Sequence, residues 1–119
     1  MSSERRVRRS DRPVEAARLY LDAAAARHHY RALTLADGQG LVVVDTPSPI
    51  DSEALAAVAP LADELPGETV DGLLGLVTRG EALRVRAFDL GGASMYLAAV
   101  GGDGAPPPEA EAAMQRIFG

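Results

Sequence analysis

Three short apolar runs in the second half of the chain constrain its fold more than any other feature. They span residues 73–78, 83–90 and 94–100, and the separators are Arg79-Gly80-Glu81 and Gly91-Gly92. Short apolar runs joined by glycine-containing turns are typical of an antiparallel meander. Because side chains alternate along a strand, the middle run should place one set on each side of the sheet. These two sets are Leu83, Val85 and Ala87 on one side, and Arg84 and Arg86 on the other.

The length and composition indicate one small domain. A chain of 119 residues suits a single domain with a modest core. Only 4% of the residues are aromatic and many of the apolar ones are alanine, so pairing with a second copy would add burial. The absence of cysteine excludes a disulfide framework, a thiolate metal site and a cysteine nucleophile. No run approaches 18 apolar residues, and we therefore expect a soluble, cytoplasmic protein.

The charge is distributed unevenly along the chain. Residues 1–12 carry five arginines and two acidic residues, a net charge of +3, so of the total of −5 the remainder carries −8. We expect a basic, flexible arm over residues 1–12 and a folded domain over residues 13–119. The arm is either a solvated terminus or a contact for nucleic acid, anionic lipid or an acidic protein surface. The arginines that would make such contacts are Arg5, Arg6, Arg8 and Arg9. The acidic body argues against nucleic-acid binding by the domain itself.

Two helices and a hairpin are predicted before the meander. Pro13 in an early turn and an alanine-rich stripe predict a first helix over residues 12–28. Asp37-Gly38 between the runs 31–36 and 41–45 predicts a β-hairpin, because Asp-Gly favours the positive φ angles of a tight turn. The second run is apolar on both faces, so it should be covered on both sides. The hairpin loop is rich in glycine, but it joins two strands and lacks a phosphate-binding motif.

The second helix should start after Asp51, whose side chain can cap it. Its apolar stripe contains Leu55, Val58, Ala59, Ala62 and Leu65. Ala54 and Leu61 widen the stripe beyond what one sheet face needs, so a second copy could pack there as well. Pro60 inside this helix is expected to bend or shorten it. A closing helix is predicted over residues 109–118.

No set of residues forms a recognisable catalytic, metal or cofactor site. His28 and His29 are neighbours whose side chains would point about 100° apart on a helix, and no third ligand follows at a suitable spacing. Ser94, Thr34 and Thr78 lie in strand patterns where we expect no histidine nearby. We therefore predict that the chain is not an enzyme and needs no cofactor.

The element order αββαβββα resembles that of the Roadblock/LC7 family, especially its bacterial MglB-like members. The resemblance covers about residues 14–102. It rests on the hairpin at Asp37-Gly38, on the alanine-rich helix over residues 53–62, and on the run Arg84-Val85-Arg86-Ala87-Phe88 that turns through Gly91-Gly92 into residues 95–100.

The resemblance implies an α/β (α+β) fold of the profilin-like type. It has a central five-stranded antiparallel sheet in the order 2-1-5-4-3, with the second helix on one face and the first and third on the other. Family members form homodimers in which the second helices pack together and the third strands meet edge to edge. In this chain the implied interface residues are Leu55, Val58, Ala59, Ala62, Leu73, Leu74 and Leu76.

The function implied by the resemblance is that of a non-enzymatic homodimeric scaffold. Such a dimer would bind a small Ras-like GTPase across the paired second helices and adjust its nucleotide cycle. One alternative is a small-ligand sensory or binding module with a cavity between sheet and helices, as in other profilin-like proteins. Another is a domain that the basic arm tethers to a larger assembly.

Overall fold

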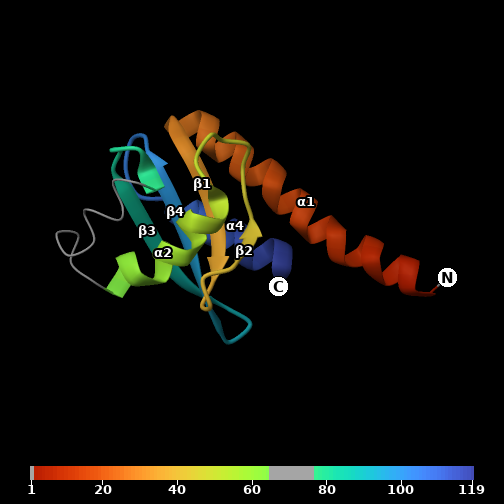
Figure 1. Cartoon of the computed structure of the whole chain (residues 1–119). Helices are drawn as coiled ribbons and strands as arrows, with labels where there is room; N and C mark the ends of the chain where they lie inside the picture. The colour runs from red at the N-terminus through yellow and green to blue at the C-terminus, as the bar shows by residue number, and fades with distance from the viewer. Residues whose placement is uncertain (1, 65–76) are drawn as a thin grey trace.

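The computed structural model describes residues 2–64 and 77–119, with side chains for residues 12–62 and 77–119. Figure 1 shows a sheet covered by helices on both faces, and a long helix that extends beyond the sheet toward the N-terminus. The mixed α/β class that the sequence predicts is confirmed. In chain order the elements are α1 (Ser2–His28), β1 (Tyr30–Asp37), β2 (Val42–Val44), α2 (Ser52–Glu64), β3 (Leu83–Leu90), β4 (Ala93–Gly101) and α4 (Pro108–Phe118).

The described sheet has four antiparallel strands in the order β2-β1-β4-β3. The predicted five-stranded sheet with the order 2-1-5-4-3 is therefore wrong for the described part of the chain. The difference lies in the predicted third strand over residues 73–78. Residues 73–76 fall outside the described residues, while Val77 and Thr78 are helical. A short apolar run fits a helix as well as a strand, so its pattern alone could not distinguish the two.

The β3–β4 hairpin forms as the meander pattern predicts. Leu83 pairs with Val100 and Leu90 with Ala93, and the turn between them consists of Gly91 and Gly92, with φ angles of 60° and 85°. Two successive positive φ angles are what a tight hairpin turn requires, and glycine adopts them without steric cost.

The predicted alternation of faces along β3 is also confirmed. Leu83 and Val85 pack on the face that α2 covers. On the opposite face, Arg86 donates from Nε to the carbonyl oxygen of Pro106 over 2.6 Å and lies 3.9 Å from a carboxylate oxygen of Glu111 on α4. This arginine therefore helps to hold the last helix on the sheet.

The first hairpin forms where Asp37-Gly38 predicts it, but the side chain of Asp37 organises the turn. Its Oδ1 accepts hydrogen bonds from the backbone N–H groups of Gln39 at 2.9 Å and Leu41 at 3.0 Å. The positive φ angle falls on Gly40, at 79°, rather than on Gly38. The turn therefore depends on an aspartate that satisfies backbone donors.

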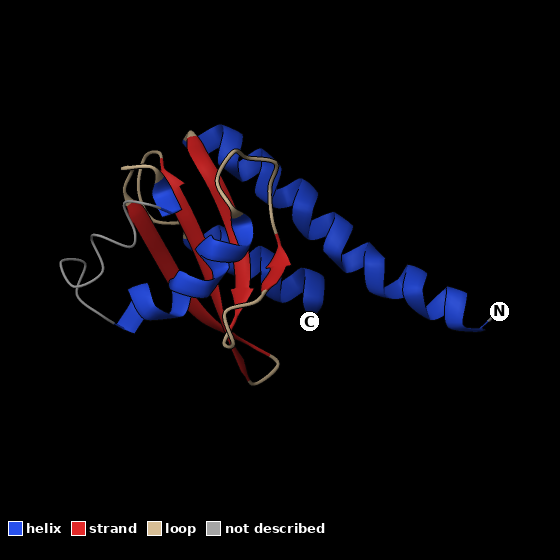
Figure 2. Cartoon of the chain, viewed as in Figure 1, coloured by secondary structure: helices blue, strands red, loops and turns tan. Residues whose placement is uncertain are grey.

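Two cores lie on opposite faces of the sheet, and Figure 2 shows α1 and α4 on one face and α2 on the other. This arrangement of helices is the one that the family resemblance implies. The first core joins α1 and α4 to the sheet through Leu21, Leu33, Leu35, Leu97 and Met114. The second joins α2 to the sheet through Ala32, Leu55, Ala59, Ala98 and Val100. Much of both cores is alanine, as the composition leads one to expect.

Helix α1 begins at Ser2, so the predicted start at residue 12 is wrong. Arginine favours helix formation, and the helix continues through the basic segment and past Pro13. The division of the chain into an arm and a domain at residue 12 stays a prediction. The projecting helix makes the molecule elongated, with extents of 50 × 27 × 24 Å.

Helix α2 begins as predicted, because Oδ1 of Asp51 accepts from the N–H groups of Glu53 at 3.0 Å and Ala54 at 3.3 Å. Pro60 lies inside the helix, which nevertheless continues to Glu64. The proline therefore does not end α2.

Candidate functional site

The outward side of α2 carries apolar side chains that the single chain leaves uncovered. Ala57 and Leu61 are exposed, and Leu61 retains 46% of its accessible surface. These two residues are four apart, so their side chains are neighbours on one side of the helix. We call Ala57 and Leu61 the outer α2 surface.

The predicted interface residues on α2 face the other way. Leu55 and Ala59 are 0% exposed and Val58 is 6% exposed, because all three pack on the sheet of their own chain. Ala62 is half-buried. Leu73, Leu74 and Leu76 lie outside the described residues. The assignment of these residues to a dimer interface stays a prediction, and the side of α2 that is open to a partner is the outer α2 surface.

The β1–β2 turn lies beside the outer α2 surface. A Cβ placed on Gly40 would be 3.2 Å from Cα of Ala57, so the turn touches the helix backbone. Leu41, the next residue, is 58% exposed.

The sequence pattern included Leu61 as a residue that widens the apolar stripe of the second helix, but it missed Ala57. The signal was available in the helical spacing, since Ala57 and Leu61 are one turn apart on the side opposite Leu55 and Ala59.

The two neighbouring histidines have separate structural roles. The ring of His28 stacks on Tyr30 with a centroid distance of 5.6 Å. His29 has a φ angle of 62° and its Nδ1 lies 3.0 Å from Oδ2 of Asp103. Within residues 12–62 and 77–119, no group of three or more potential metal ligands comes together. The contact between His29 and Asp103 joins the end of α1 to the loop after β4.

The hydroxyl groups considered as nucleophiles are dispersed. Ser94 is exposed near the β3–β4 turn, whereas Thr34 and Thr78 are each 1% exposed. Tyr30 pairs with Gly101 and Asp37 with Met95, so Ser94 and the histidines lie at opposite ends of the sheet. This geometry keeps Ser94 apart from both histidines, and Thr34 and Thr78 are buried.

The space between the sheet and its helices is occupied by core side chains, such as Leu33, Leu97 and Leu55, which are all fully buried. Two cavities that described residues line open instead at the surface. One, of about 290 Å³, includes Arg31 and Arg79. The other, of about 300 Å³, includes Asp89 and Ser94 beside the β3–β4 turn. Neither of these two cavities lies between the sheet and its helices, where the alternative of a ligand-binding module would place its pocket.

The N-terminal arginines lie on the helical backbone of α1, and their contacts stay a prediction. Among the described residues, no helix combines the length and apolarity that a bilayer crossing needs.

No protein-family model matches this sequence, and no protein with a curated description does so either. Solved structures do match. The gliding protein MglB from Thermus thermophilus is similar with a TM-score of 0.54 and 20% sequence identity, over 89% of this chain and 90% of that one. MglB from Myxococcus xanthus gives a TM-score of 0.49 and 11% identity over 88% and 84% of the two chains. The Thermus comparison shows a common fold across most of both chains.

Proposed function

We propose, from the premise that this chain has the fold of MglB, a protein of the Roadblock/LC7 type, that it is a non-enzymatic homodimeric scaffold regulating a small Ras-like GTPase. The shared fold over 89% of the chain is the observation that carries the proposal. The resemblance read from the sequence points to the same family and supplies the class of partner.

The exposed apolar side chains on α2 support the homodimer. Leu61 is 46% exposed in the single chain, and Ala57 beside it is exposed as well. An apolar surface on the second helix of this fold is where a second copy would pack, since its burial removes apolar area from water. Two chains joined in this way would present a continuous platform to the GTPase.

The non-enzymatic role is supported by the placement of the polar residues. Ser94, the exposed hydroxyl among the candidates, is separated from the histidines by the length of the sheet, since Tyr30 pairs with Gly101 and Asp37 with Met95. A scaffold can act on a GTPase by holding its loops in one of two arrangements, and this requires differential binding rather than a catalytic side chain.

The experiment combines the purified chain with the Ras-like GTPase of its own genome. We expect light scattering to give the mass of a dimer for the chain alone, and a heavier complex with the GTPase in one nucleotide state. We also expect the rate of GTP hydrolysis or nucleotide release to change when the chain is added. A protein that neither binds the GTPase in any nucleotide state nor alters these rates would contradict the proposal.

A further inference from the structure

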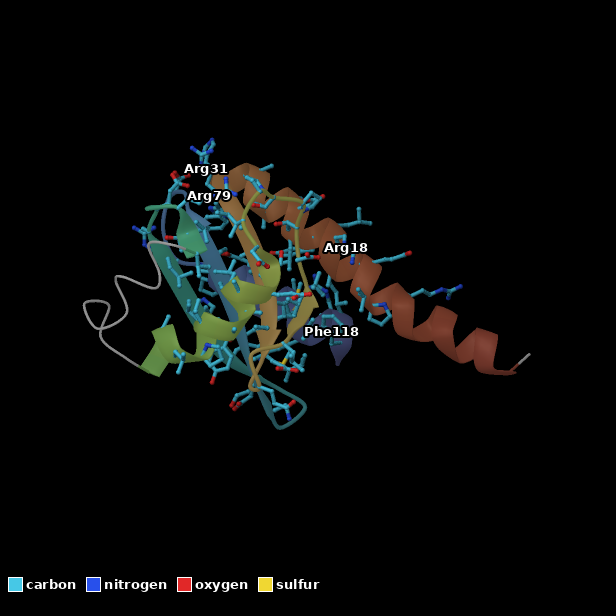
Figure 3. All side chains as sticks on the ribbon, in the orientation of Figure 1. Arg18, Arg31, Arg79 and Phe118 are labelled. Carbon is cyan, nitrogen blue, oxygen red and sulfur yellow. The ribbon has the colours of Figure 1, made fainter. Side chains whose placement is uncertain are left out.

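A basic notch lies at the end of the sheet where β1 begins. It has a volume of about 290 Å³, and its described lining consists of Arg31, Pro49, Ile50, Thr78, Arg79 and Glu81. The lining comes from three separate segments, namely the start of β1, the approach to α2 and the turn before β3. Figure 3 shows Arg31 and Arg79 together at this end of the molecule.

The backbone holds Arg79 in an uncommon conformation. Its φ angle is 57°, that of Gly80 is 83°, and the N–H of Glu81 closes the turn by donating to the carbonyl oxygen of Thr78 over 3.2 Å. A residue with a Cβ is disfavoured in this region, and glycine or asparagine is the usual choice. Residues held in such conformations are found preferentially at functional sites, so the arginine here needs a reason beyond the turn.

The guanidinium group of Arg79 is fixed at the edge of the notch. Its Nη2 donates to the carbonyl oxygen of Pro49 over 3.1 Å. Within the described part of the chain, no ion pair joins this guanidinium to a carboxylate. A guanidinium has five N–H donors in a planar fork, so the bond to Pro49 leaves donors for a second acceptor.

The second guanidinium of the notch is paired with the one acidic group of its described lining. Nε of Arg31 lies 2.8 Å from Oε2 of Glu81. The side chains of Arg31 and Glu81 retain 66% and 36% of their accessible surface, so solvent screens this pair. The described lining therefore has one more positive charge than negative, in a chain whose total charge is −5.

We propose that this notch is a binding site for the oxyanion group of a small ligand, either a phosphate monoester or a carboxylate. Two guanidinium groups at one cavity match the geometry and charge of an oxyanion, which they can bind through charge-assisted hydrogen bonds. The volume is close to the lower end of the range for small-molecule pockets. The site is separate from the outer α2 surface, because neither Ala57 nor Leu61 lines it.

The test is an NMR titration of the full chain with inorganic phosphate and, separately, with acetate, at constant ionic strength. We expect saturable shifts of the backbone amide signals of Ile50, Thr78 and Glu81 with at least one of the two probes. Saturation by phosphate alone would assign a phosphate monoester, and saturation by acetate alone would assign a carboxylate. If neither probe produces saturable shifts beyond those caused by chloride, the proposal is wrong.

Arg79→Gln tests the residue that carries the site. We expect it to weaken binding at least about tenfold, because it removes a charged donor from the oxyanion. Arg116→Gln is the matched control, since Arg116 is an exposed arginine on α4 that does not line the notch. An unchanged affinity in Arg79→Gln, or an equal loss in Arg116→Gln, would overturn the proposal.

Glu81→Gln keeps the proposal testable if Arg79→Gln does not fold. Removing the carboxylate frees Arg31 and eliminates the repulsion of the ligand, so binding should become about two- to fivefold tighter. A gain in affinity cannot result from unfolding. Weaker or unchanged binding in Glu81→Gln would contradict an oxyanion site.

Discussion

At the scale of single residues, a buried hydroxyl without a partner distinguishes Thr34 from Thr46. Thr34 is 1% exposed, and its Oγ1 is buried with no hydrogen-bond partner. Thr46 is 5% exposed, and its Oγ1 both donates to the carbonyl oxygen of Leu33 and accepts from the N–H of the same residue, each over 3.2 Å. Two threonines with the same chemistry therefore contribute to stability with opposite sign.

Thr34→Val should raise the free energy of unfolding by about 1 kcal/mol, because valine has the same shape and buries no unpaired hydroxyl. Thr46→Val is the matched control and should lower it by roughly 1–3 kcal/mol, because it leaves two backbone groups of Leu33 without their partner. Urea unfolding followed by circular dichroism measures both. A loss of stability in Thr34→Val would mean that its hydroxyl has a partner.

The ionisation of Tyr30 should make the free energy of unfolding depend on pH in the alkaline range. Burial raises the pKa of its phenol above the ordinary value of 10.0, Arg84 lowers it, and Asp103 raises it, with a net increase. The protonated hydroxyl donates to the carbonyl oxygen of Gly104 over 2.9 Å. The folded chain therefore holds this proton at a pH where the unfolded chain releases it.

The contribution of Tyr30 to stability should be complete below pH 10 and should decrease as the pH rises through the raised pKa of the folded state. We expect the free energy of unfolding of the wild type to fall more steeply above pH 10 than that of Tyr30→Phe, which cannot ionise. Urea unfolding between about pH 8 and 11 measures the two slopes. Equal slopes would show that Tyr30 does not cause this dependence.

At the scale of elements, α2 has two apolar sides with different roles. One side, with Leu55 and Ala59, packs on the sheet, while the outer α2 surface stays open. A helix of 13 residues that is apolar on both sides is expected either in the interior of a large protein or between two packed surfaces. The proposed dimer would cover this second side of α2 with another copy of the chain.

Leu61→Arg should dissociate the proposed dimer, with a dissociation constant at least about tenfold higher, because it places a charge in an apolar contact. Leu19→Arg is the matched control, because Leu19 is 72% exposed on α1, on the other face of the sheet. Light scattering over a dilution series measures both. A dimer that tolerates Leu61→Arg as well as Leu19→Arg would exclude the outer α2 surface from the interface.

At the scale of the whole molecule, the charge and shape are both asymmetric. The basic segment over residues 1–12 is part of α1, which projects beyond the sheet, while the rest of the chain is acidic. A projecting basic helix next to an acidic body can reach an anionic surface without bringing the body close to it. This arrangement fits the role of a tether to a larger assembly.

Deleting residues 1–12 should make a fluorescent fusion of the chain diffuse in the cell and leave the proposed dimer intact. Replacing Arg5, Arg6, Arg8 and Arg9 with lysine keeps the charge and should preserve the localisation if the contact is purely electrostatic. Fluorescence microscopy and light scattering give the two readouts. An identical distribution of the deleted and full-length chains would show that the domain alone directs localisation.

The sequence predicted most elements of the fold because their signals are local. Asp51 caps a helix, Gly91-Gly92 forms a tight turn, and Arg86 alternates with Val85 across a sheet, each within a few residues of chain. The third predicted strand was wrong at Val77 and Thr78, where a short apolar run carries no distinguishing period. The basic notch could not be predicted, since Arg31 and Arg79 are 48 positions apart and meet only through packing.

The sequence by itself determined the mixed class, the presence of the first, second and last helices and of the two hairpins, the uneven charge and the lack of cysteine chemistry. Only the tertiary structure decided which side of α2 is covered, which threonine hydroxyl has a partner, and which arginines line one cavity. The physical reason is the distance along the chain over which each interaction acts. Propensity, capping and turn geometry act between near neighbours in the chain, whereas burial and pairing depend on contacts that exist only after the sheet has assembled.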